Sequence, residues 1–571
     1  MIHLSLSIGV VLVTILSGTW APRCWANSSY ETQTLKAIDF IEDVFSVSYA
    51  PKEWKRKQSN WDLLQVTDRA RQHVAGMGAE LDQKSAQQIL RKLLGSAQDY
   101  HVAIHFYGTE NASLPIEIRS AENRFFVVWI DRKKLPEKSF PVKVGDEITS
   151  FRGRPVLEER DDVLGELNHN VSETDQSLSE MYLTRRFART GLKVPSGPVD
   201  IEVNRTDEKE TKTISHQLIW DYEKEKIGFS LQSEPVGSLT EKKSNHHLAD
   251  LSMTWGNWFD WDSVSEVEEE NPYRIGSKKS YVPEMGSILW KEEKDKKFHA
   301  YTFRTDEGQI YGFIRIPSYG AGESEAKEFL GLIEKMEKQT DALLIDQVNN
   351  PGGSVFYLYA LVSMLTDKPL ITPKHRMAIT QYDVNEALDD LDKLKDVKTE
   401  EEAKKVLGET MGGYPISYQL VQFFRSYSQF LVDEWNRGAR LTSPYFLGID
   451  KVLPHPEHHY TKPILVLINE TDFSGGDFFP AILQDNQRAR LMGVRTAGAG
   501  GYVRGVSFPN FLGISGFSVT SSIAERVDLN PIENLGVTPD VSYSLTAEDY
   551  QKEFAPYKKK ILAELQSMVA K

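Results

Sequence analysis

The sequence is almost without cysteine, because Cys24 is the only one among 571 residues. This residue lies near the amino terminus, in a stretch that we expect to be removed after export. The mature chain would then contain no thiol. Disulfides, a cysteine nucleophile and thiolate metal ligands are therefore excluded as explanations of its function.

Long apolar runs and an excess of positive charge are also lacking. The apolar stretch within residues 1–26 extends only from Leu4 to Leu16, which is shorter than the ~20 residues of a spanning helix. The segment of residues 1–26 ends in Cys24-Trp25-Ala26, with small residues where a signal peptidase cuts. No Lys or Arg precedes its apolar stretch. We therefore expect residues 1–26 to be a cleaved signal peptide, the protein to be secreted, and no stable insertion in a membrane.

The formal charge of the chain is −15, from 67 basic and 82 acidic residues. A net negative charge argues against nucleic acid as the principal partner and against an anionic membrane surface. The composition, 40% hydrophobic and 26% charged, is that of a soluble globular protein, and the length indicates several domains.

Residues 27–113 are predicted to form a small, mainly helical amino-terminal domain. Apolar residues such as Ile38, Ile41 and Phe45 recur at helical spacing. The helical pattern ends before His101, and residues 102–106 have the pattern of a strand. His101 is therefore predicted at a strand edge, with His105 inside the strand.

Residues 114–236 are rich in predicted strands. Val142 to Ile148, followed by Arg152-Gly153-Arg154-Pro155-Val156, resembles the signature of PDZ domains. Such a domain can bind an extended peptide by adding it as a strand, and a purely structural packing role is equally compatible with the pattern.

Residues 237–285 are polar and acidic, yet they include a cluster of large aromatic residues: Trp255, Trp258, Phe259 and Trp261. Exposed aromatic clusters lower solubility, so we expect this segment to pack against another surface. An ordered linker without a regulatory role is the alternative.

Residues 286–571 alternate strand and helix patterns, which predicts a parallel sheet built from βαβ units, with a charged helical insertion at 382–440. Two strand-to-helix turns carry candidate chemistry. Asn349-Asn350-Pro351-Gly352-Gly353 exposes backbone N–H groups suited to an oxyanion site, and Ser474-Gly475 places a hydroxyl at a helix N-terminus. The alternatives are a capping turn for the glycines and a helix N-cap for Ser474.

These turns, together with Leu483-Gln484-Asp485-Asn486 and the glycine-rich stretch after Arg495-Thr496, resemble the tail-specific or C-terminal-processing serine peptidase clan. Its lysine-dependent members carry a Gly-Lys-Gly turn that supplies the general base. The matching turn here is Gly498-Ala499-Gly500, so a Ser-Lys dyad is excluded at that place.

Within the clan, the chain is most similar to the branch of chlamydial protease-like activity factors. The shared segments run in the same order, from Tyr49–Lys55 through Asp99–His101 and Asp346–Leu365 to Ile532–Pro539. The resemblance implies a catalytic apparatus of Ser474, His101 and Glu533 in a crotonase-like αβ domain, with oxyanion donors among Gly352, Gly353 and Gly475. It further implies a self-processed zymogen with an inhibitory segment, an active homodimer, protein substrates that include host proteins, and no cofactor or metal.

Two other functions fit parts of the sequence. The first is an inactive scaffold of the same fold that binds peptides. The second is a metal hydrolase that uses three histidines in Leu-Pro-His-Pro-Glu-His-His, namely His455, His458 and His459. Their spacing matches no standard helical zinc motif, and the two prolines indicate a surface turn.

Overall fold

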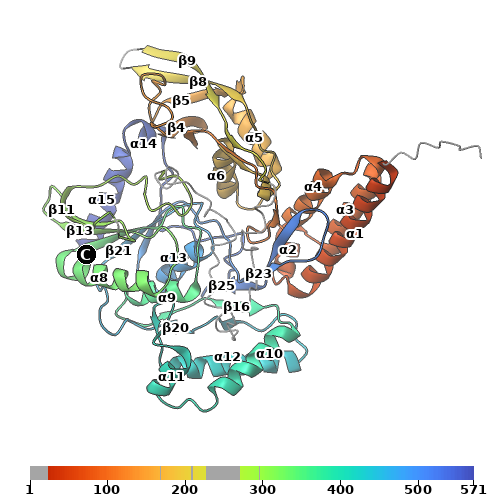
Figure 1. Cartoon of the computed structure of the whole chain (residues 1–571). Coiled ribbons are helices and arrows are strands. Elements are labelled where there is room, and N and C mark those ends of the chain that lie inside the picture. Colours follow the sequence, from red (N-terminus) through yellow and green to blue (C-terminus); the bar gives the residue numbers. More distant parts are fainter. Residues whose placement is uncertain (1–22, 168, 208–209, 227–270, 295, 571) are drawn as a thin grey trace, which may run out of the picture.

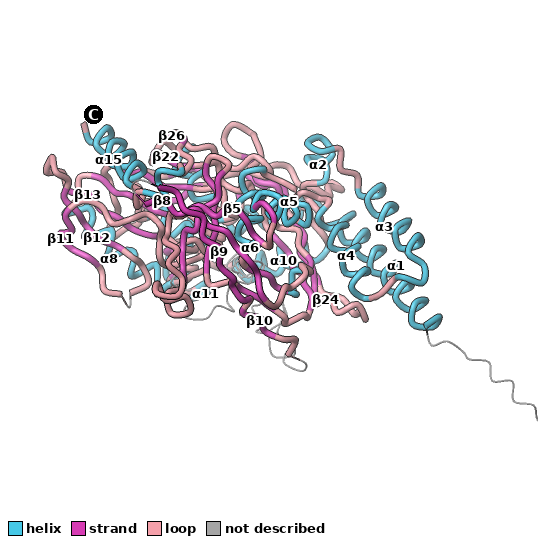
Figure 2. The backbone as a smooth tube through the Cα atoms, turned by 90° about the horizontal axis from the view of Figure 1, so that it is seen from above, coloured by secondary structure: helices cyan, strands magenta, loops and turns pink. Residues whose placement is uncertain are grey.

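The computed structural model describes residues 23–167, 169–207, 210–226, 271–294 and 296–570 (Figure 1). Helices gather at one end of the molecule and strands form its centre (Figure 2). The architecture is multidomain α/β, as the sequence predicted. No helix within the described ranges combines the length and the apolar content required to cross a membrane.

The amino-terminal domain is a helical layer completed by strands from the other end of the chain. Its helices α3 and α4 are capped by Asp62 and Asp82, which accept from backbone amides three residues later. The predicted strand after His101 is β1, and Ile104 in it lies opposite Phe517 in β24. Side chains of β24 are part of the core of the helical domain. The elements are α1 (Arg23–Ser48), α2 (Lys52–Ser59), α3 (Leu63–Met77), α4 (Gln83–Gly95), β1 (Ile104–Phe106), β23 (Val503–Val506) and β24 (Ile514–Thr520).

The PDZ-like domain is an antiparallel sheet with strand order β3-β4-β5-β8-β9 and β6 paired to β5. Helices α5 and α6 pack beside it, and a small sheet of β10, β2 and β7 joins it to the helical layer. The elements are β2 (Asn111–Ser113), β3 (Ile116–Ala121), β4 (Arg124–Ile130), β5 (Glu147–Phe151), β6 (Arg154–Pro155), α5 (Val156–Glu166), α6 (Ser172–Leu183), β7 (Arg185–Phe187), β8 (Pro198–Asp207), β9 (Glu210–Ile219) and β10 (Asp221–Glu223).

The catalytic domain is organised around a seven-stranded sheet of order β11-β12-β13-β14-β21-β22-β26. The strands from β13 to β26 are parallel, which confirms the βαβ prediction. Helices α8, α9 and α13 share a core with one face of the sheet, and α14 and α15 share a core with the other. The elements are β11 (Ser287–Lys291), β12 (Ala300–Arg304), β13 (Ile310–Arg315), α8 (Glu323–Gln339), β14 (Ala342–Asp346), α9 (Val355–Ser363), β21 (Ile464–Ile468), α13 (Gly475–Asp485), β22 (Arg490–Gly493), β26 (Val541–Ser542), α14 (Ala547–Gln551) and α15 (Ala555–Val569).

The helical insertion extends from the lower edge of this domain in Figure 1. Its helices are α10 (Gln381–Leu394), α11 (Glu400–Leu407) and α12 (Tyr418–Asn436). Short strands connect it to the domain: β15 (Leu370–Ile371), β16 (Lys374–Met377), β17 (Thr410–Met411), β18 (Tyr414–Pro415), β19 (Tyr445–Phe446), β20 (Lys451–Val452) and β25 (Ser522–Glu525). The prediction of a helical insertion at 382–440 agrees with these bounds.

The predicted aromatic cluster of Trp255, Trp258, Phe259 and Trp261 lies outside the described residues. The end of that segment, residues 271–285, is described and is folded between two domains. Asn271 donates to Glu117 of the PDZ-like domain at 2.9 Å, and Arg315 of the catalytic domain donates to the Ser277 carbonyl at 3.0 Å. These fifteen or so residues therefore behave as part of the folded body rather than as a free linker.

Candidate active site

Ser474 lies on a strained turn between β21 and α13. Its backbone has φ 55° and ψ −112°, and its side chain is 2% exposed. A positive φ is costly for a residue with a Cβ, and such strain is typical of turns that present a nucleophile. The hydroxyl makes no capping bond to α13, and no hydrogen-bond partner for Oγ lies within the described part of the chain. Ser474 therefore occupies the N-cap position of α13, but its hydroxyl does not cap the helix.

The glycine turn of residues 350–353 packs directly against Ser474. A Cβ placed on Gly352 would lie 2.7 Å from Ser474 Cβ, and one placed on Gly475 would lie 3.2 Å from Gly353 N. The amide of Gly352 already donates to Asn350 Oδ1 at 2.8 Å. The amides of Gly353 and Gly475 have no acceptor among the described residues. Two of the three predicted oxyanion donors are thus available beside the serine.

The glycine turn is not needed to cap α9. Ser354 performs that task, since its side chain accepts from the Tyr357 amide. The interpretation of Gly352-Gly353 as a capping turn alone is therefore not supported.

The buried carboxylate of Asp472 joins the two turns. Its Oδ1 accepts from the Asn350 amide at 2.9 Å, and its Oδ2 accepts from the Asn469 amide and from Gln347 Nε2, each at 3.0 Å. Burial raises the pKa of Asp472 well above its usual range, and these donors oppose the rise. Asp472 thus helps to fix the position of the glycine turn relative to Ser474, together with the bond from the Phe473 amide to the Asn350 carbonyl at 2.8 Å.

The segment that contains His101 contacts the serine turn through Tyr100. The ring of Tyr100 meets the ring of Phe473 edge-on, with centroids 5.4 Å apart, so the residues before His101 and before Ser474 are in contact. Burial lowers the pKa of His101 to about 4; nearby Asp99 opposes the shift, and Lys55 adds to it. The imidazole is therefore neutral at pH 7, as a general base must be.

Asp99 fixes the backbone of this histidine. Its Oδ1 accepts from the His101 amide at 2.9 Å, while its Oδ2 accepts from Tyr49 Oη at 3.1 Å and Thr520 Oγ1 at 2.8 Å. Donors from α1, from the loop before β1 and from β24 thus converge on one carboxylate.

Glu533 is fully buried in the same cluster. Its Oε2 accepts from the Gly500 amide at 3.2 Å, and its Oε1 accepts from Lys55 Nζ. Burial raises the pKa of Glu533, with nearby Asp99 adding to the rise and Lys55 opposing it. Because Asp99 and Lys55 act on both His101 and Glu533, the two predicted residues lie in one electrostatic environment.

The turn Gly498-Ala499-Gly500 is anchored on the serine helix. The amides of Gly498 and Ala499 donate to the Asp477 carboxylate at 2.8 and 3.0 Å. Burial raises the pKa of Asp477 to about 7. The turn therefore occupies the place that the family pattern requires, and the lysine that enters the cluster is Lys55 from α2.

Sequence reasoning assigned no role to Lys55, Asp99, Tyr49 or Thr520. Three of these residues lie in segments that carried the family resemblance, but no spacing rule connects positions so far apart. A lysine at the centre of a short polar helix gives no sign that it is buried. Lys55 nonetheless has no exposed side-chain surface.

The three histidines of the metal-hydrolase alternative do not converge. His455 Nδ1 accepts from the Glu457 amide, His459 Nδ1 lies 3.3 Å from the His455 carbonyl, and His458 Nε2 lies 3.5 Å from Glu334. Within the described ranges, no group of three or more His, Cys, Asp or Glu side chains could hold a metal ion.

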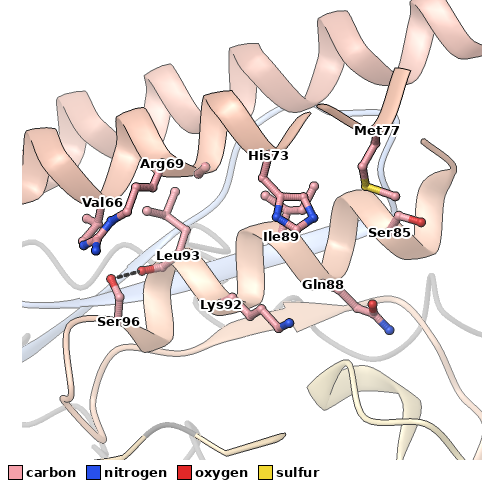
Figure 3. Close-up of a pocket in the computed structure, with 11 residues that line it drawn as sticks. Val66, Arg69, His73, Met77, Ser85, Gln88, Ile89, Lys92, Leu93 and Ser96 are labelled. Carbon is pink, nitrogen blue, oxygen red and sulfur yellow. Dashed lines mark hydrogen bonds between the residues drawn. The ribbon is translucent and has the colours of Figure 1, made fainter. Parts of the chain in front are cut away.

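The site is closed in this structure. Ser474 and His101 are each 2% exposed and Glu533 has no exposed surface. A cavity of about 400 Å³ does lie in the amino-terminal domain between α3 and α4 (Figure 3), but none of the predicted site residues lines it. The three side chains of the predicted site are therefore buried.

Comparisons with known proteins identify the family of the chain. A PDZ domain model matches residues 110–227, and a model of peptidase family S41 matches residues 310–543. A Chlamydia muridarum protein is 37% identical over 569 residues, covering 93% of this chain and 92% of that protein. A Chlamydia pneumoniae protein is 38% identical, covering 90% of this chain and 86% of its own length. The chain belongs to peptidase family S41 and is a serine peptidase.

Within that family, the solved structures place it beside CPAF, the chlamydial protease-like activity factor. Mature CPAF complexed with lactacystin superposes with a TM-score of 0.81 at 34% identity, covering 95% of this chain and 99% of that one. A second structure of mature CPAF gives the same TM-score and identity. The resemblance identified from the sequence is confirmed.

We expect Gly352→Ala to disturb the serine turn by collision. Gly352 and Gly408 have nearly the same φ, 91° and 92°, but a Cβ on Gly408 would meet nothing closer than 3.7 Å. Backbone strain costs both variants about 1–2 kcal/mol, and overpacking adds roughly 1–3 kcal/mol at Gly352 alone. Thermal unfolding of the two variants measures the difference, and equal losses would contradict the packing described here.

We expect His375 to make stability fall on acidification. His375 lies in β16, 3% exposed and stacked on Phe478, and burial lowers its pKa to about 3. The unfolded chain, with a pKa near 6.5, takes up this proton first as the pH falls, so stability is lost below about pH 6.5.

The measurement is the unfolding free energy at pH 7 and pH 5. Wild type should lose about 2 kcal/mol more than His375→Gln over this interval. The exposed His73 provides the control, since His73→Gln should follow wild type. A parallel pH response of His375→Gln and wild type would show that His375 titrates normally.

Proposed function

We propose that this serine peptidase is a secreted endopeptidase, made as a self-processed zymogen, that cleaves protein substrates through Ser474, His101 and Glu533. The observation that carries the proposal is the serine itself. Ser474 is strained, has no hydrogen-bond partner for its Oγ within the described part of the chain, and lies beside the amides of Gly353 and Gly475. These are the features of a nucleophile next to an oxyanion site.

The catalytic cycle follows from these positions. His101 takes the proton of Ser474 Oγ as the oxygen attacks the scissile carbonyl, and returns it to the leaving amine. The amide of Gly475, at the N-terminus of α13, and the amide of Gly353, just before α9, stabilise the oxyanion. Gly352, which donates to Asn350, instead holds the turn in shape. Glu533 stabilises the imidazolium, directly or through a water. In the second step, His101 takes a proton from a water molecule that attacks the carbonyl of the Ser474 acyl-enzyme, and returns it to Ser474 Oγ as the carboxylic acid product leaves.

The closed site supports the zymogen part of the proposal. Ser474, His101 and Glu533 are at most 2% exposed, so the intact chain leaves these side chains little access to a protein substrate. We propose that residues 237–285 inhibit the newly made chain, and that cleavage within this segment opens the site and permits an active homodimer. The solved CPAF structures are described as mature, which accords with a maturation step in that relative.

We expect a biotinylated fluorophosphonate to label Ser474. Peptide mapping should locate the adduct there, and Ser474→Ala should lose both labelling and peptide-bond hydrolysis by several orders of magnitude. Ser428 is the matched control, because it is also fully buried with no partner for its Oγ among the described residues, and Ser428→Ala should behave as wild type. Hydrolysis by Ser474→Ala at the wild-type rate would refute the assignment.

We expect activation to require cleavage between residues 237 and 285. Wild type added in catalytic amounts should nick the Ser474→Ala chain there, as mass spectrometry would detect. Peptidase activity should appear earlier than in wild type when four aromatic residues are changed to serine: Trp255, Trp258, Phe259 and Trp261. If the four rings are buried against the site, they would stabilise the inhibited state by several kcal/mol, at about 25 cal/mol per Å² of apolar surface removed from water. Full activity of the intact chain before any cleavage would refute the zymogen proposal. The assignment of Ser474 as the nucleophile would remain valid.

A further inference from the structure

Lys55 joins the amino-terminal helical domain to the proposed catalytic carboxylate. It lies in α2, and its side chain has no exposed surface. Its ammonium group donates to the Gln98 carbonyl at 2.6 Å, to Asn534 Oδ1 at 2.8 Å and to Glu533 Oε1. An ammonium group has three hydrogens, so every one has an acceptor.

The acceptors of Lys55 surround the site on two sides. Gln98 immediately precedes the Asp99–His101 stretch, and Glu533 and Asn534 lie in the turn that follows β25. The contact is reinforced by the preceding residue, since Trp54 Nε1 donates to Asn534 Oδ1 at 2.9 Å. Asn534 itself has a positive φ of 63° and donates to the Gln98 carbonyl at 2.8 Å. Helix α2 therefore clamps the histidine loop and the glutamate turn together.

We propose that Lys55 is a positioning residue of the peptidase, which fixes the Glu533 carboxylate. Catalysis then requires that α2 is packed in the position described here. The inference rests on the proposed function of Ser474, His101 and Glu533. A buried carboxylate without its partner is strongly disfavoured, so Glu533 would take up a proton or move if Lys55 were removed. A lysine thus serves this site from another domain, although the local turn Gly498-Ala499-Gly500 has none.

The charge of Lys55 also has a predictable effect on the base. The titratable groups whose charges act around His101 and Glu533 are Tyr49 from the end of α1, Lys55 from α2, and Asp99. The positive charge of Lys55 lowers the pKa of His101 and also that of Glu533. Removing that charge raises the pKa of His101 and the pKa of Glu533. His101 then becomes neutral, and Glu533 ionised, only at a higher pH.

The test compares Lys55→Met with Lys57→Met, an exposed lysine on the same helix. Fluorescein-labelled casein and the fluorophosphonate probe are used with the matured protein between pH 3 and pH 9, a range that includes the pKa of about 4 of His101. Lys55→Met should lower kcat on the order of 100-fold, as expected for a displaced catalytic group, and should shift the acidic limb of the pH profile upward by about one unit. Lys57→Met should match wild type in both measurements.

Lys55→Arg separates charge from geometry. It keeps the positive charge, so its acidic limb should coincide with that of wild type, but its planar guanidinium cannot reproduce the three ammonium bonds, so kcat should fall while KM changes little. This variant also decides the question if Lys55→Met shows no cooperative unfolding transition. Wild-type kcat in Lys55→Arg would then overturn the positioning role.

The outcomes distinguish this inference from the function on which it depends. If wild type neither cleaves casein nor labels at Ser474, the proposed function fails. If wild type does both and Lys55→Met keeps the wild-type acidic limb, with or without a lower kcat, Lys55 is only a structural residue and this inference fails alone.

Discussion

One buried carboxylate sets the geometry on which the proposed chemistry depends. Asp472 accepts hydrogen bonds from the turn after β14 and from the turn after β21, and it is completely enclosed. An enclosed carboxylate is tolerated only when donors satisfy it, so neither turn can move without leaving that group uncompensated. The two turns therefore act as one rigid unit. The adjacent ends of parallel strands bring them together, and Asp472 holds them there together with the bonds of Asn469 and Thr471 to Asn349.

A second set of contacts brings in the parts of the site that the sheet cannot supply. His101 comes from the loop before β1 and Lys55 from α2, whereas Ser474 and Glu533 belong to the catalytic domain. Asp99 connects the two sides through Tyr49 and Thr520. The helical layer is consequently part of the proposed active site and not a separate cap. This explains how a member of family S41 can lack a lysine in the Gly498–Gly500 turn and still gather a base and a carboxylate.

The sequence predicted the parts of this structure that follow from local pattern. The strand expected at residues 102–106 contains β1, and the parallel order of β13, β14 and β21 follows from alternating strands and helices. Motif resemblance then identified Ser474, His101 and Glu533 as candidates, and the structure places their segments together. The roles of these residues remain predictions.

What sequence reasoning missed depends on contacts between distant residues. The φ of Ser474, the bond that uses the Gly352 amide and the burial of Lys55 are all decided by neighbours that no local pattern reveals. The aromatic cluster around Trp258 also remains a prediction, because it lies outside the described residues.

The pairing of β1 with β24 has a consequence for how the molecule folds. Ile104 lies opposite Phe517, so this ladder closes a loop of most of the chain, and the core of the helical layer is incomplete without β24. Contacts between residues so far apart in the sequence form late in folding. Closing the long loop costs chain entropy before the contacts can stabilise it. The His101 side of the proposed active site can therefore assemble only after the chain has been made as far as β24, and a nascent chain would carry the Ser474 turn before the proposed base is in place.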